Sequence, residues 1–180
     1  MERRRLVFRH TVEGLFVRAY GARVTPELHE RFRSLGLDLD AIPTAVDAEV
    51  YRQAYELLRE RLHPGVTPHE ADVLMARGFI DGYFETIIGQ LTKMMVRVLP
   101  VEKHIERSSR NFEAAVNFVT SRVEKLGPKL FRMTVSDYSL SPQFTVGILG
   151  RMFEIAGVSQ SEVKLEKEEG RAFSVLLSWR

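Results

Sequence analysis

Four polar side chains suited to binding or proton transfer lie between residues 110 and 138. Arg110, Asn111, Asn117 and Tyr138 surround the end of a predicted helix and the first predicted hairpin. A guanidinium, two amides and a phenol can orient a substrate or donate hydrogen bonds to developing charge. Catalysis would also need a titratable group with a perturbed pKa in the same cleft. An enzyme of unrecognised type therefore stays open, and no catalytic residue is predicted.

The remaining chemistry-bearing residues predict no metal centre. His63 and His69 straddle a proline-glycine break and lack the i, i+4 spacing that presents two imidazoles to one zinc ion. Asp38 and Asp40 lie in a predicted loop without further ligands at the spacing of a calcium loop. The sequence also contains no G-x-S-x-G, phosphate-loop, G-x-G-x-x-G or H-E-x-x-H motif.

Composition excludes several further classes. The 180 residues include no cysteine, which excludes disulfides, thiolate nucleophiles and iron–sulfur clusters and favours a cytoplasmic location. With 26 basic and 24 acidic residues the net charge is only +2, so nucleic acid is not a predicted partner. The longest mostly apolar stretch, residues 79–99, carries four charged residues, so no integral membrane segment is predicted.

The first two thirds of the chain predict helices. Thr25 and Pro26 begin one helix over residues 26–35, and apolar spacing predicts a second over about 47–62. Thr67 and Glu70 form a capping box that begins the next helix. This helical pattern extends to residue 99, as one long helix or as two joined by a kink. Pro100 then begins a short helix that ends near residue 112 and carries His104.

Three glycines interrupt the helical pattern between residues 67 and 99. Gly78, Gly82 and Gly89 each cost a helix about 1 kcal/mol relative to alanine, so something is expected to pack close to the backbone there. Another helix of the same chain, a homodimer seam and a ligand pocket are the three alternatives.

The last third of the chain predicts a ββαββ unit. Apolar residues alternate over 118–126 and 130–138, follow helical spacing over 142–156, and alternate again from Val163 to Trp179. The predicted fold is α+β, a single domain over 1–180 in which a mainly helical part (about 1–112) packs on a four-stranded antiparallel sheet (about 113–180). Trp179 is expected to be substantially buried in an integral last strand.

These residues carry a family resemblance. The run Ser141–Gly157, followed by residues 163–166 and 173–179, is similar to the C-terminal part of haem nitric-oxide/oxygen-binding sensor domains. That fold group also includes four-vinyl-reductase-type domains and a family of TRAPP subunits. Over its whole length the chain resembles a family of uncharacterised domains enriched in myxobacteria, through Thr11–Phe16, Gly36–Asp40 and Arg110–Phe112 among other stretches.

The resemblance to the haem family implies a test of single residues. His104 lies on the helix before the first hairpin, where that family keeps its proximal haem ligand. The family's Y-x-S-x-R motif, which holds the haem propionates, falls at Tyr138, but Leu140 and Pro142 occupy its serine and arginine positions. Without the arginine, the propionates lose a bidentate cationic partner. Haem is therefore an alternative rather than an expected cofactor.

Together these observations favour a non-enzymatic sensory or scaffolding domain. Its expected partner is an apolar small molecule, or a protein, including a second copy of the chain. A haem-based gas sensor with His104 as proximal ligand is the alternative, besides an unrecognised enzyme. The candidate ligand contacts are His104, Arg110, Asn111, Tyr138, Gly78 and Gly82.

Overall fold

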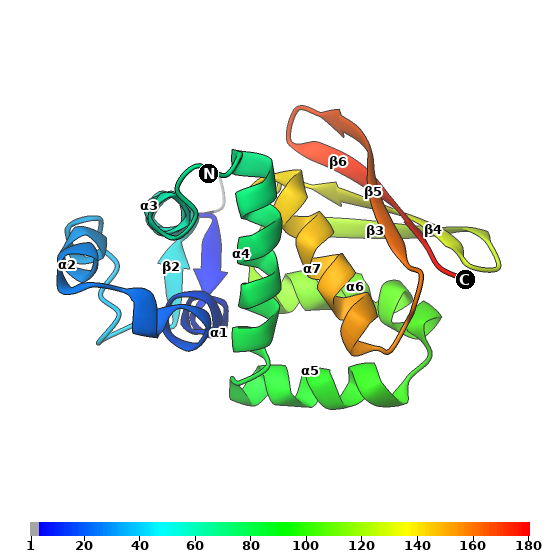
Figure 1. Cartoon of the computed structure of the whole chain (residues 1–180), viewed down its shortest axis with the longest axis horizontal. Coiled ribbons are helices and arrows are strands. Elements are labelled where there is room, and N and C mark those ends of the chain that lie inside the picture. The colour runs from blue at the N-terminus through cyan, green and yellow to red at the C-terminus, as the bar shows by residue number, and fades with distance from the viewer. Residues whose placement is uncertain (1–3) are drawn as a thin grey trace.

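A helical N-terminal part and a sheet-bearing C-terminal part meet along one central helix. The computed structural model describes residues 4–180, apart from the side chains of residues 108 and 109. Helix α4 (Pro68–Tyr83) stands between the first helices on one side and α7 (Pro142–Ile155) with the sheet on the other (Figure 1). The predicted α+β fold with a four-stranded antiparallel sheet is confirmed.

The N-terminal part contains the predicted helices and one small sheet that the sequence did not indicate. Strand β1 pairs antiparallel with β2, so that Val7 lies opposite Val46. Helix α1 continues into a π-helical turn, η1, and a short 3₁₀ turn, η2, follows. The bounds of the elements are β1 Leu6–Phe8, α1 Arg9–Val12, η1 Glu13–Ala19, η2 Gly21–Arg23, α2 Pro26–Ser34, β2 Ala45–Asp47 and α3 Ala48–Leu62.

The helical stretch after residue 67 forms two helices rather than one. The capping box predicted at the start of α4 is present, because the Thr67 hydroxyl accepts a hydrogen bond from the Glu70 backbone N–H and the Glu70 carboxylate accepts one from Thr67 N–H. Thr86 then caps a separate helix, α5 (Ile87–Val98). A Cβ at Gly89 would lie only 1.7 Å from the Tyr83 carbonyl oxygen, so the corner between α4 and α5 requires glycine.

The C-terminal part has the predicted hairpin–helix–hairpin order. Helix α6 runs over Val101–Ala115, three residues beyond its predicted end. The sheet order is β3-β4-β6-β5, and Met133 on β4 lies opposite both Val123 and Val175. The strands are β3 Thr120–Gly127, β4 Leu130–Ser136, β5 Glu162–Glu169 and β6 Ala172–Ser178.

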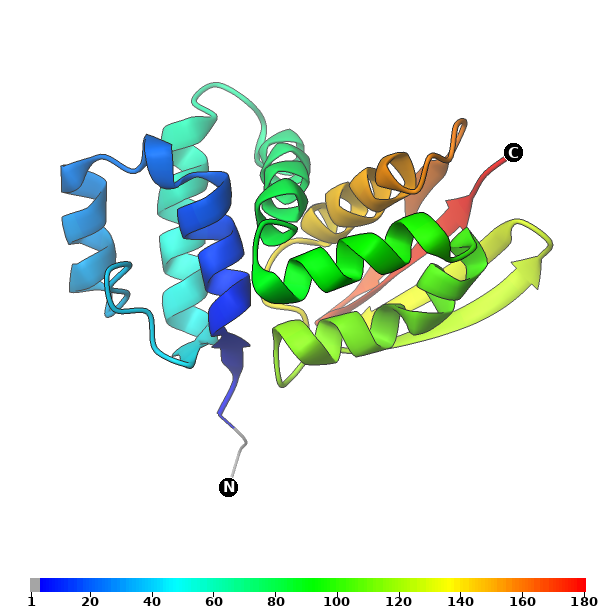
Figure 2. The same ribbon diagram turned by 90° about the horizontal axis from the view of Figure 1, so that it is seen from below.

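Among the described residues, helices cover one face of the sheet. Phe131, Val135 and Leu177 alternate along β4 and β6 and are buried, as period-two spacing requires. Helix α6 contacts β3 and α7 contacts β5 on this face. Figure 2 shows α5, α6 and α7 on the same side of the strands. Within residues 4–180, no helix is both long and apolar enough to span a lipid bilayer.

Trp179 lies one residue beyond the end of β6. Its ring stacks on Phe131 at 5.7 Å between centroids and lies 5.7 Å from the ring of Phe153 on α7. The prediction that the last strand is integral to the sheet is confirmed. Trp179 itself is half-buried, which is less than predicted, because it lies beyond Ser178, the last paired residue of β6.

Candidate functional site

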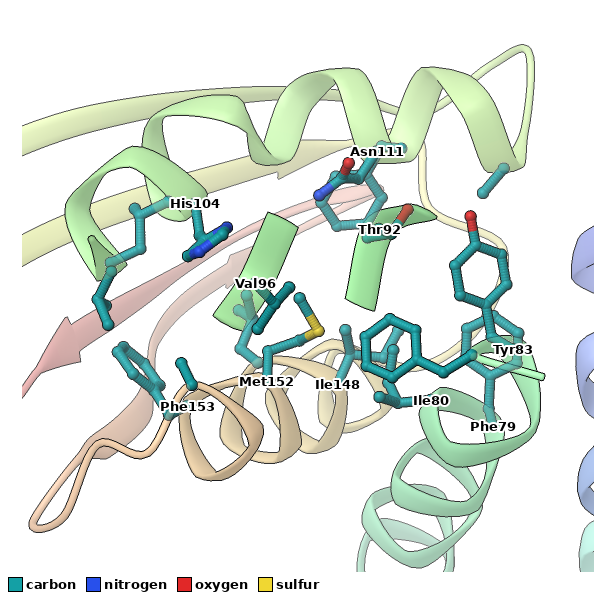
Figure 3. Close-up of a pocket in the computed structure, with 17 residues that line it drawn as sticks. Phe79, Ile80, Tyr83, Thr92, Val96, His104, Asn111, Ile148, Met152 and Phe153 are labelled. Atoms are coloured by element: carbon teal, nitrogen blue, oxygen red, sulfur yellow. The ribbon is translucent and has the colours of Figure 1, made fainter. Parts of the chain in front are cut away.

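A largely apolar cavity lies where α4, α5, α6 and α7 meet. Its volume is about 140 Å³, and all but four of its 17 lining residues are apolar (Figure 3). Helix α4 contributes Phe79 and Ile80, whereas α7 contributes Ile148, Met152 and Phe153. The last turns of α4 and the second half of α7 therefore form an apolar floor and wall, because their helical periodicity directs large side chains to the same side.

Helices α5 and α6 close the other sides of the cavity. Val96 on α5 is 2% exposed and Ile105 on α6 is 5% exposed, and both line the space. Phe112 and Ala115 continue the α6 wall. Because α6 begins directly after Pro100 and α5 ends at Val98, a short corner holds both helices over the mouth of the cavity.

Four lining residues offer polar atoms to the cavity: Tyr83, Thr92, His104 and Asn111. Burial raises the pKa of Tyr83, and its contact with Thr92 partly opposes that rise. His104 Nε2 lies 3.1 Å from the Leu99 carbonyl oxygen, which can only accept, so this nitrogen carries the N–H and donates a hydrogen bond to the backbone. A bound molecule would thus meet few polar groups in a largely apolar space, which is the usual composition of a small-molecule site.

Two of the six predicted ligand contacts, His104 and Asn111, line this cavity together. Arg110 lies beside it, in a smaller hollow of about 100 Å³ that shares His104 and Asn111 and also contains Arg107. Tyr138 lies elsewhere, because its hydroxyl donates a 2.6 Å hydrogen bond to Glu168 at the edge of the sheet.

Gly78 and Gly82 do not line the cavity. A Cβ at Gly78 would lie 2.1 Å from the Tyr20 hydroxyl, and one at Gly82 would lie 2.4 Å from the backbone nitrogen of Ala19. The close approach predicted from these glycines is therefore made by η1 and by Tyr20 directly after it, in the same chain, rather than at a homodimer seam.

The polar residues of the enzyme hypothesis do not converge on one cleft. The Asn117 side chain accepts a 2.8 Å hydrogen bond from the Leu6 backbone and donates one of 3.0 Å to the Arg4 carbonyl, so it anchors β1 to the end of α6. Tyr138 faces Glu168, whereas Asn111 faces the cavity. The side chains of Asn111, Asn117 and Tyr138 therefore make separate contacts.

Sequence reasoning missed a buried polar cluster around Asp72 on α4. Asp72 is 1% exposed and accepts hydrogen bonds from the Tyr55 hydroxyl (2.6 Å), from Arg59 (2.9 Å) and from Ser141. Burial, with Asp72 beside it, raises the pKa of Tyr55. The cluster ties α3, α4 and the start of α7 together. Asp72 sits in the first turns of a helix, where an acidic residue is ordinarily exposed, so the sequence carried no signal of its burial.

One acidic cluster resembles a metal site more closely than the sequence suggested. One ligand atom each of His29, Asp38 and Asp40 lie within 4.8 Å of one another. However, the Arg33 guanidinium already bonds Asp40 at 3.2 Å and lies 3.6 Å from Asp38. The positive charge of Arg33 thus takes the place that a bound cation would have. The pKa of Asp38 is lowered chiefly by the hydrogen bond from the Asp40 backbone and, to a smaller extent, by the charge of Arg33. The cluster is satisfied as it stands.

Solved structures of H-NOX domains share this fold. A double-mutant H-NOX domain labelled Tt superposes with a TM-score of 0.71 at 10% identity and covers 95% of this chain and 94% of its own. The Fe(II) unliganded H-NOX protein from K. algicida gives 0.61 at 16% identity, with 95% of each chain covered. A single-mutant H-NOX domain of T. tengcongensis gives 0.60 at 13% identity, covering 94% of this chain and 93% of its own. At these identities the similarity shows the fold alone.

The residues around the cavity do not fit a haem. A cavity of roughly 150 Å³ accommodates a molecule the size of benzene, and a porphyrin is several times larger. None of the described lining residues is a lysine or arginine that could pair with a propionate. Leu140 and Pro142 occupy the positions predicted for the propionate-binding serine and arginine. His104 lines the space, but the rest of a haem-binding set is missing from its walls.

No curated protein matches this chain. A protein-family model matches the chain over nearly the whole length of the fold described above, from β1 through the final strand β6. It includes every residue that lines the cavity and the complete Asp72 cluster. The chain therefore belongs, over residues 5–180, to the family described as "Protein of unknown function (DUF2378)".

Proposed function

We propose that this protein is a non-enzymatic sensory domain that takes a small apolar molecule into the cavity between α4, α5, α6 and α7. The observation that carries the proposal is the cavity itself, about 140 Å³ with only four polar residues in its wall. A concave space with a mostly apolar wall and a few polar groups is the usual form of a small-molecule site.

The dimensions and lining indicate the class of ligand. An engineered apolar cavity of roughly 150 Å³ binds benzene or xenon, so a single ring or a short branched chain matches the volume. The side-chain amide of Asn111 and the imidazole of His104 stand at one side and would orient a polar substituent. The occupant we expect is therefore a compact apolar molecule with at most one or two polar atoms.

Benzene titration provides the direct test. We expect benzene to raise the thermal midpoint and to shift amide resonances of α4, α5, α6 and α7. Ala115→Leu places a larger side chain into the cavity and should abolish both effects, whereas Ala114→Leu changes the neighbouring exposed position and should preserve them. A benzene response that survives in Ala115→Leu, or that is missing from the wild type, contradicts the proposal.

Native mass spectrometry of gently purified protein tests the same site without a chosen probe. A retained small molecule in the wild type that disappears in Ala115→Leu would identify the natural ligand.

The rival enzyme hypothesis has less support, because its polar residues serve separate contacts.

The haem alternative makes a different spectroscopic prediction. Expressed with haem supplied, the protein should show no stoichiometric Soret band, because the cavity is small and its wall offers no propionate partner. His104→Ala should then change neither the fold nor the spectrum. A stoichiometric Soret band that is lost in His104→Ala would instead assign the protein to the haem sensors, with His104 as the ligand.

A further inference from the structure

Helix α5 exposes an unusually apolar outer face. Six of the eleven exposed large hydrophobic side chains among the described residues belong to this one helix of 12 residues. Four of them form a stripe, with Ile87 84% exposed, Leu91 61%, Met94 61% and Val98 76%. A stripe of this kind on a protein surface ordinarily marks an interaction site.

The two faces of α5 are separate. At 100° per residue, the four stripe residues fall within a narrow sector, and Gly89 and Val96, which are buried, lie on the opposite side. The outer stripe therefore cannot reach the cavity while the inner face closes it. Figure 1 shows α5 along the lower edge of the molecule, where no other element of residues 4–180 lies beneath it.

We propose that the α5 stripe is a self-association surface, on which the α5 helix of a second copy of this chain packs antiparallel across a two-fold axis. The intervals between the stripe residues are four, three and four. This pattern reads the same in both directions, so the two-fold axis places Ile87 opposite Val98 and Leu91 opposite Met94 of the other copy. The spacing is also that of a helix-pairing seam.

The charges next to the stripe favour the antiparallel arrangement. Glu85 precedes the stripe and Arg97 stands near its end, and both are exposed. Antiparallel pairing brings the start of α5, which Glu85 precedes, to the end of the other copy's α5, which carries Arg97. Parallel pairing would bring the two Arg97 side chains together. Lys93, near the centre, is turned back over the ring of Phe84, 5.9 Å from its centroid.

The size of the surface sets the expected strength. A standard interface uses roughly 20–30 residues on each side, which is more than a helix of 12 residues provides. We therefore expect a concentration-dependent dimer with a Kd no tighter than about micromolar. This proposal is independent of ligand binding, since it uses only the outer face of α5.

Cysteine cross-linking tests the geometry, and the absence of native cysteines leaves no background. Ile87→Cys and Val98→Cys variants, given tags of different mass, are mixed and oxidised. Antiparallel pairing predicts that the mixed disulfide exceeds both symmetric disulfides. Symmetric disulfides in excess would indicate parallel pairing, and equal traces of all three would indicate no specific pairing; either result overturns the proposal.

Sedimentation equilibrium tests the energetics. Leu91→Glu should raise the dimer Kd at least about tenfold, because it places a charge in the apolar seam. Leu74→Glu is the matched control at a 43% exposed position on α4 and should leave the Kd unchanged. Circular dichroism of both variants checks that the fold is retained. Glu85→Arg and Arg97→Glu should each weaken the dimer, and the double variant should restore it.

A lipid surface is the other occupant that such a helix could meet. Co-sedimentation with phosphatidylcholine–phosphatidylserine vesicles distinguishes the two. A wild-type chain that stays monomeric at high concentration yet binds these vesicles through Leu91 overturns the dimer. A monomer that binds no vesicles also overturns it.

Discussion

The two ends of the interface between α4 and α7 are built differently. At the end that contains Asp72, the helices touch backbone to backbone, and a Cβ at Gly147 would lie 2.7 Å from both the Ala76 Cβ and the Val73 carbonyl oxygen. At the other end, Phe79 and Met152 stand around the cavity. The end that contains Asp72, the closed end, thus fixes the position of the two helices relative to each other. The end around the cavity, the open end, leaves room between them.

This difference suggests how the domain keeps a cavity without losing its fold. Close packing and a satisfied buried carboxylate hold the helices at one end, where the hydrogen bonds of Asp72 join three elements. The cavity at the other end then costs only the contacts that its wall lacks. An occupant can therefore be accepted without repacking the N-terminal part of the molecule.

Removing the carboxylate of the closed end should produce the largest effect. We expect Asp72→Ala to lower the free energy of unfolding by about 3 kcal/mol, since it leaves Arg59 and the Tyr55 hydroxyl without their shared acceptor. Chemical denaturation measures the change. Arg77→Ala breaks an exposed ion pair with Glu154 and should cost only about 0.5 kcal/mol. Equal losses in the two variants would show that the Asp72 cluster does not fasten the helices.

Adding a methyl group at the closed end should also be costly. Gly147→Ala should destabilise the protein by about 2 kcal/mol, because the new Cβ meets the backbone of α4. The control is Gly150→Ala on the same helix, where no neighbouring atom lies within 4 Å of the new Cβ. That substitution should stabilise the helix by about 0.5–1 kcal/mol. A harmless Gly147→Ala would show that the helices are free to separate there.

Trp179 supports the wall of the cavity at the open end, since its ring packs against Phe153, which lines the cavity. Trp179→Ala should cost about 2 kcal/mol in a denaturation experiment, below the usual ~3–5 kcal/mol for a fully buried aromatic residue, because the ring is half-buried. Benzene binding should weaken as well. Unchanged stability would show that the open end does not depend on the C-terminal residues.

The smallest effect concerns pH at the open end. His10 lies 5.9 Å from the ring of Tyr83, and burial lowers its pKa, a shift that its hydrogen bond to Ala114 and the charge of Glu13 partly offset. The unfolded chain binds this proton more readily, so stability should fall as pH decreases below about 6.5. His10→Phe should flatten that slope in denaturation curves recorded between pH 7 and 5. An unchanged slope would exclude His10 as its source.

Local signals in the sequence predicted much of the fold. The capping box of Thr67 and Glu70, the prolines at helix starts and the alternation along β4 and β6 act within a few residues, so they are readable without the rest of the chain. The close approach at Gly78 and Gly82 was also predictable, although its partner, η1 with Tyr20 in the same chain, was one of three alternatives.

The site depended on contacts between distant residues. His104 and Asn111 were candidates from their place in the chain, but the cavity they line exists only because residues from four helices leave a space unfilled. The pairing of β1 with β2 and the burial of Asp72 likewise join segments that are far apart in sequence. Periodicity states which face of an element is apolar and does not state what covers it.

The sequence by itself determined the helix starts at Pro26 and Pro68 and the ββαββ unit, since both follow from local spacing and residue type. The tertiary structure alone decided which apolar faces are closed and which stay open. The inner face of α5 covers a cavity and its outer face is bare, although both read as apolar in the sequence. The physical reason is that burial depends on which elements pack together, a property of the whole fold.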